Sequence, residues 1–150
     1  MKKTLLVLLL LAATSVVMAA DTTNVTAVIN GKRVQFRPDI GDQIAQKSVA
    51  LLASCAYVNA KPKWGAGGSE PKSIEDAQKQ SHLHLVFSSP VKVEVPVEKA
   101  TVQVREIVVS LPLATAGIWV RTKDGVMYFA MFDGTARSGL QKLLDDAQKP

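Results

Sequence analysis

The chain has 150 residues, of which 47% are apolar and 21% are charged, and its formal net charge at pH 7 is +5. This length and composition exclude an intrinsically disordered chain and favour one domain over several. Lys2 and Lys3 supply two of the surplus positive charges, and removing them from +5 leaves +3 for residues 21–150, which is too weak an excess to indicate a nucleic-acid partner.

Residues 1–20 have the three parts of a secretory signal peptide: a positive start at Lys2 and Lys3, a nine-residue apolar core, and small residues before Asp21. The apolar core is too short to cross a membrane, since a spanning helix needs about 20 apolar residues. We therefore expect residues 21–150 to form a soluble domain exported to the periplasm or the extracellular space, without a transmembrane segment after signal removal. An uncleaved membrane anchor is the alternative.

The first part of this domain predicts a β-hairpin over residues 25–37. Asn30-Gly31 is the dipeptide best suited to a two-residue turn in which both residues have positive φ. With this turn, Ala27 lies opposite Val34, and the apolar side chains of both strands gather on one face.

A long helix is predicted over about 39–58, with Asp39 as its N-cap, because apolar residues recur at helical spacing from Ile40 to Cys55. Cys55 is the only cysteine, so no internal disulfide can form and the fold must depend on its hydrophobic core. Near the negative end of this helix a thiolate is disfavoured. We expect a buried, inert thiol and not a nucleophile activated by a histidine.

Residues 61–72 contain two Pro, three Gly and Trp64, which is the composition of a flexible loop. An exposed Trp64 beside lysines is suited to contact a glycan, a membrane surface or a partner protein. The alternative is a tryptophan that folds back to anchor the loop. Residues 73–76 then predict a short helical turn.

Alternation of period two predicts three strands, at residues 82–87, 91–97 and 101–111. Pro90 and Pro96 restrict the middle strand to an edge of the sheet, because proline cannot donate to a central ladder.

A second hairpin is predicted over 118–132, turning at Asp124-Gly125 with Thr122 opposite Met127. Both faces of this hairpin are largely apolar, so we expect it to lie centrally and to be covered on part of each side.

A C-terminal helix is predicted over about 135–148, capped by Asp133 or Thr135. Consecutive strands are connected as hairpins and not through regular βαβ units, which favours a single α+β domain. Its antiparallel sheet would consist of the N- and C-terminal hairpins and the middle strands, packed by the long helix and the C-terminal helix.

His82 and His84 are the only histidines, and their spacing places both rings on one face of a strand, where they could bind a metal. A third ligand would have to come from Glu94, Glu98 or Glu106, and the spacing selects none of them. Two ligands do not make a site, so we expect a polar strand face without a metal or cofactor.

Glu106 interrupts the apolar phase of its strand, and a buried carboxylate there needs a partner. Arg121 in the last hairpin is the candidate. The pair could anchor the carboxylate of a ligand or brace the sheet, whereas a bulge at Arg105-Glu106 would turn Glu106 to solvent.

The sequence contains no recognised catalytic motif. We therefore expect a non-catalytic binding or interaction module of the cell envelope or extracellular space, whose partner is a protein, a cell-wall component or a small molecule. The candidate binding residues are Trp64, His82, His84, Glu106 and Arg121. The alternatives are a small metal-dependent or hydrolytic enzyme centred on His82 and His84, and an inhibitor of an exported enzyme.

Overall fold

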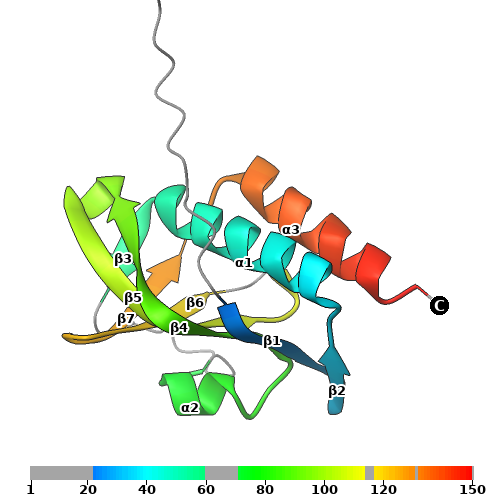
Figure 1. Ribbon diagram of the computed structural model, residues 1–150. Coiled ribbons are helices and arrows are strands. Elements are labelled where there is room, and N and C mark those ends of the chain that lie inside the picture. Colours follow the sequence, from blue (N-terminus) through cyan, green and yellow to red (C-terminus); the bar gives the residue numbers. More distant parts are fainter. Residues whose placement is uncertain (1–21, 60–70, 114–116, 131, 150) are drawn as a thin grey trace, which may run out of the picture.

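A computed structural model describes residues 22–59, 71–113, 117–130 and 132–149 (Figure 1). The predicted signal peptide and Trp64 lie outside these residues. The described elements are β1 (Thr22–Ile29), β2 (Lys32–Gln35), α1 (Pro38–Ala53), β3 (Tyr57–Asn59), α2 (Ile74–Ala77), β4 (His82–Val95), the 3-10 turn η1 (Pro96–Glu98), β5 (Ala100–Ser110), β6 (Ile118–Thr122), β7 (Gly125–Ala130) and α3 (Gly134–Ala147).

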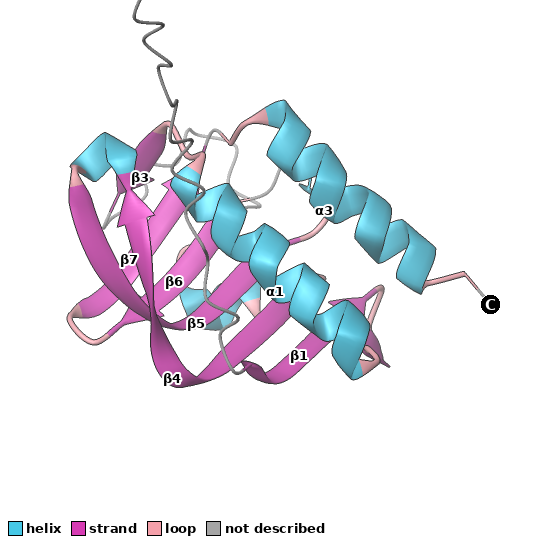
Figure 2. Ribbon diagram, turned by 45° about the horizontal axis from the view of Figure 1, so that its top comes forward, coloured by secondary structure: helices cyan, strands magenta, loops and turns pink. Residues whose placement is uncertain are grey.

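The strands form one seven-stranded antiparallel sheet in the order β2-β1-β4-β5-β6-β7-β3. Helices α1 and α3 lie side by side over one face, and the short α2 lies against the other (Figures 1 and 2). This arrangement confirms the predicted single α+β domain with an antiparallel sheet. None of the helices in the described ranges has both the length and the apolar composition needed to cross a membrane.

The main core lies between the sheet and the pair of long helices. Its largest side chains, each less than 2% exposed, are Ile44, Leu51, Leu52, Leu83, Leu85, Ile107, Ile118, Phe129, Leu140 and Leu144. They come from both helices and from four strands, so burial of this one layer holds together segments that are far apart in the sequence.

The N-terminal hairpin has the predicted register, with Ala27 opposite Val34. Asn30 and Gly31 have φ values of 50° and 76°, as a tight two-residue turn requires.

The C-terminal hairpin has the predicted faces but not the predicted register. Thr122 lies opposite Gly125 and not Met127, a displacement of two residues. The Thr122 hydroxyl accepts a hydrogen bond from the Asp124 N–H (3.1 Å) and donates one to the Gly125 carbonyl (3.2 Å), which places the turn at Lys123-Asp124. Because the displacement is even, the side chains of β6 and β7 stay on their expected faces. The predicted hairpin places Phe132 on the face of Trp119, but Phe132 lies past the end of β7 and belongs to the main core.

Helix α1 is shorter than predicted and has a different cap. Arg37 is the N-cap, Pro38 occupies the first turn, where its missing N–H is tolerated, and Asp39 lies beyond the cap. The helix ends at Ala53, and Cys55 therefore lies just past it. The predicted continuation to residue 58 is wrong, since Tyr57–Asn59 pair with β7 and satisfy the backbone along that side of the sheet.

The other two helices agree with their predictions. The Asp133 carboxylate caps α3 by accepting from the Thr135 N–H (3.0 Å), and the Ser73 hydroxyl caps α2 by accepting from the Asp76 N–H (3.1 Å).

Strand β4 joins the two strands predicted at 82–87 and 91–97. Its register shifts between Val86 and Val91, and β5 carries a bulge between Val104 and Glu106 at the same level. Beyond the shift, residues 91–95 pair with β5 alone among the described residues, which confirms the predicted edge position. The strand ends at Val95 and not at residue 97, because η1 begins at Pro96.

Leu85 and Val86 allow a matched test of this core, since Leu85 is 0% exposed beneath the long helices and Val86 is 36% exposed on the opposite face. We expect Leu85→Ala to lower the free energy of unfolding by about 2–5 kcal/mol, because it leaves a cavity. Val86→Ala should cost less than about 1 kcal/mol. Urea denaturation followed by circular dichroism measures both, and equal losses would contradict the two-sided sheet.

Candidate functional site

A polar cluster lies on the face of the sheet that carries α2. It combines His84 of β4, Glu106 of β5 and Arg121 of β6 with Gln78 and Glu75 from the region of α2. The strands are neighbours in the sheet, and Glu106 and Arg121 are directly opposite each other. The cluster thus brings together three of the five residues singled out in the sequence.

Glu106 is at the centre of the cluster, and its side chain is 17% exposed. Its Oε1 accepts from His84 Nε2 (2.9 Å) and Gln78 Nε2 (3.1 Å), and its Oε2 accepts from Arg121 Nε (2.8 Å). An ionised carboxylate only accepts, so the ring proton of a neutral His84 is on Nε2. Three donors therefore compensate the partial burial of this carboxylate.

Arg121 lies between two carboxylates of its own chain. Its Nη2 donates to Glu75 Oε1 at 3.1 Å while its Nε holds Glu106. The bonds to Glu106, and then those to Glu75, raise the pKa of the guanidinium. The pKa of Glu75 is lowered, first by its own backbone N–H and then by Arg121. Because the Arg121 guanidinium is already paired with two carboxylates of its own chain, this cluster is suited to brace the sheet and poorly suited to attract a ligand carboxylate.

The bulge in β5 explains how Glu106 leaves the core. Two residues of β5, Arg105 and Glu106, occupy the space of one residue of β6, so Val104 points to the main core and Glu106 to the opposite face. The bulge considered in the sequence analysis is present. However, Glu106 does not turn to solvent, because Arg121, His84 and Gln78 enclose it.

His82 lies beside this cluster and makes a different contact. It is 6% exposed, and its Nδ1 donates to the Gln80 carbonyl at 2.7 Å. Its ring centroid lies 6.2 Å from that of His84. Within the part of the chain that the structure describes, no group of three or more His, Cys, Asp or Glu side chains is placed to hold a metal ion.

An aromatic pair lies under α2 and is not among the residues predicted from the sequence. Trp119 is 3% exposed, and its ring lies 5.0 Å from that of Tyr128, packed with Ile74 and Ala77 of α2. A Cβ at Gly117 would overlap the Tyr128 ring, so any larger residue at this position would displace Tyr128. The apolar character of both hairpin faces was the available signal.

Cys55 is buried, as predicted. It is 6% exposed and belongs to the core beneath the long helices, whereas His84 lies on the other face of the sheet. The sheet therefore separates the thiol from the imidazole, and the two do not form a nucleophile and base pair.

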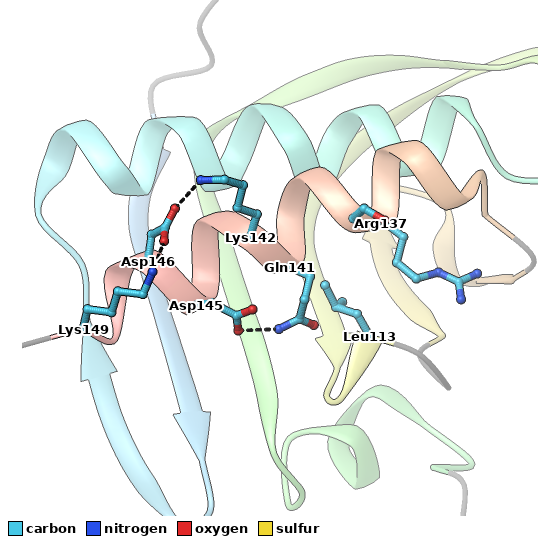
Figure 3. A pocket seen from close by; sticks show the side chains of 8 residues that line it. Leu113, Arg137, Gln141, Lys142, Asp145, Asp146 and Lys149 are labelled. Atoms are coloured by element: carbon cyan, nitrogen blue, oxygen red, sulfur yellow. Dashed lines mark hydrogen bonds and ion pairs between the residues drawn. The ribbon is translucent and has the colours of Figure 1, made fainter.

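The surface groove beside α3 has a volume of about 590 Å³ (Figure 3). Lys142 and Lys149 on its wall both bind Asp146, each at 2.6 Å, and lower the pKa of this carboxyl to about 2. Leu113 contributes an apolar patch. Because these two lysines are already paired, they do not make the groove a site for an anion.

The outer edge of β4 at residues 91–95, here called the open edge, is the second candidate site. Lys92 and Glu94 are exposed, and they alternate with Val93 and Val95, which are 4% and 0% exposed. On the side away from β5, no strand among the described residues pairs with this segment.

The chain matches no protein-family model, no curated protein and no solved structure. The two candidate sites are therefore supported by the geometry of this chain alone.

A double-mutant cycle tests the central pair of the cluster. We expect Glu106→Ala and Arg121→Ala to show a coupling of about 1–2 kcal/mol in urea denaturation, because the pair is partly buried and charge-assisted. The matched cycle of Arg121 with Glu75 should show a smaller coupling, since those side chains are 42% and 62% exposed. Equal couplings in the two cycles would contradict the central role of Glu106.

Proposed function

We propose that the protein is an exported, non-catalytic module that binds a protein partner along the open edge of β4. The observation that carries this proposal is that, among residues 22–59, 71–113, 117–130 and 132–149, only β5 pairs with residues 91–95. A strand paired on one side only presents backbone N–H and C=O groups along its other side. Such an edge captures an extended segment by adding it as a further strand.

The shape of the sheet supports this role. After the register shift that begins at Val86, residues 91–95 of β4 remain paired with residues 100–104 of β5. Together they extend to η1 on the side of the sheet that α1 occupies (Figures 1 and 2). The valines of the open edge are packed in the main core, so the edge is held in an extended form before a partner arrives. A preformed edge lowers the entropic cost of binding.

The polar cluster supports a non-catalytic role. The Glu106 carboxylate already accepts three hydrogen bonds, from His84, Gln78 and Arg121, and its side chain is only 17% exposed, which leaves it little access to the proton of a substrate. The metal-dependent or hydrolytic alternative centred on His82 and His84 has less support, because His82 is 6% exposed and the described residues contain no group of three or more His, Cys, Asp or Glu side chains placed to hold a metal ion.

The proposed location rests on residues 1–20, whose charge and apolar pattern are those of an export signal. An inhibitor of an exported enzyme would be one form of this module, since an added strand can also occupy the partner's own binding surface.

Photo-crosslinking in cells that export the protein tests the proposal. With a photoreactive residue in place of Lys92 on the open edge, we expect a covalent adduct with a protein partner. The same residue in place of Lys123, exposed at the turn between β6 and β7, is the matched control and should give none. Peptide mapping should place the crosslink in an extended segment of the partner. Absence of an adduct at position 92, or equal adducts at both positions, would contradict the proposal.

A further inference from the structure

The open edge has a self-complementary sequence. Residues 90–96 read Pro-Val-Lys-Val-Glu-Val-Pro, so positions at equal distances from Val93 carry either the same residue or residues of opposite charge. Val91 matches Val95, Lys92 matches Glu94, and the two prolines match each other. This is the pattern that an antiparallel pairing with an identical segment requires.

We infer that the partner of the open edge is a second copy of this chain, paired antiparallel about a two-fold axis at Val93. The inference rests on the proposed function and names its partner. In this dimer Lys92 of each copy lies opposite Glu94 of the second copy, and Val91 lies opposite Val95. A two-fold interface uses the same patch twice, so the two ion pairs are equivalent.

The charges select one register. A displacement of the axis by one residue, to Lys92 or to Glu94, places two lysines or two glutamates opposite each other, which is unfavourable. An axis between two residues would join the core face of one sheet to the solvent face of the other. Pro90 and Pro96 have no N–H to donate, so they limit the ladder to the five residues between them.

The burial pattern agrees with this pairing. Lys92 and Glu94 are exposed, so the ion pairs would form on the solvent side of the joined sheets, while Val93 and Val95 remain in the two cores. Exposed ion pairs contribute little energy. They would determine register and orientation, and backbone hydrogen bonds would supply most of the affinity.

Charge-reversal variants at Lys92 and Glu94, made in the full mature chain of residues 21–150, test the inference. Sedimentation equilibrium over a wide range of concentrations measures their dimerisation. We expect the unmodified chain to dimerise. K92E and E94K should each weaken the dimer by about tenfold, because each creates two like-charge contacts, a change equivalent to about 1.4 kcal/mol. The double variant K92E/E94K should restore the dimer to within about threefold. E98K reverses an exposed charge in η1, outside the open edge, and should have no effect.

A mixing experiment separates pairing from any effect on folding. An equal mixture of the two single variants should form a dimer more readily than either variant alone, because the two acidic side chains of one face the two lysines of the other. Circular dichroism should show unchanged secondary structure in all variants, since both positions are exposed.

Two results would overturn the inference: a monomer at every concentration, or a dimer indifferent to both single reversals. Lysine and proline on an edge can also serve to prevent pairing, and a monomer would assign them that role. An adduct with a different protein at position 92, together with a monomer in sedimentation, would overturn the second copy as partner and leave the proposed function standing. Without an adduct or a dimer, both proposals would be wrong.

Discussion

Strands β4 and β5 both depart from regular pairing at the same level of the sheet, between Val86 and Val91 in one and between Val104 and Glu106 in the other. Before these irregularities, at residues 82–86, β4 is a central strand with neighbours on both sides. After them, at residues 91–95, it is an edge strand within the described part of the chain. Bulges increase the local twist and bend of a sheet. Both candidate sites depend on these two irregularities. The bulge in β5 places Glu106 on the α2 face. The register shift in β4 precedes the open edge, where β4 no longer pairs with β1.

Glu106 shows how this sheet tolerates a charged residue. A carboxylate in the apolar phase of a regular strand would enter the main core, where an unpaired charge is very costly. The bulge moves it to the opposite face, and Arg121, His84 and Gln78 supply donors to both of its oxygens. The cluster connects three strands to the region of α2, whose single short turn of helix also packs Ile74 and Ala77 against Trp119.

Sequence alone predicts the faces of this sheet better than its pairings. Period-two alternation decides which side chains enter the core, and it remains correct even where the register of the last hairpin is wrong by two residues, because that displacement is even. The partnership of Glu106 with Arg121 is predictable, since a carboxylate in an apolar phase needs a cation. The roles of Gln78 and Trp119 are not, because they depend on where α2 lies in space. Local periodicity extends the predicted helix to about residue 58, because it does not show that Tyr57–Asn59 pair with the edge of β7.

Cys55 has a consequence for how the chain matures. With a single thiol in the whole sequence, buried at 6% exposure, the fold has no covalent crosslink to complete after its backbone is in place. Its formation therefore needs neither an oxidant nor an enzyme that rearranges disulfides, and in the folded domain burial shields the Cys55 thiol from exchange with surrounding disulfides. Oxidising and reducing surroundings should yield the same native state.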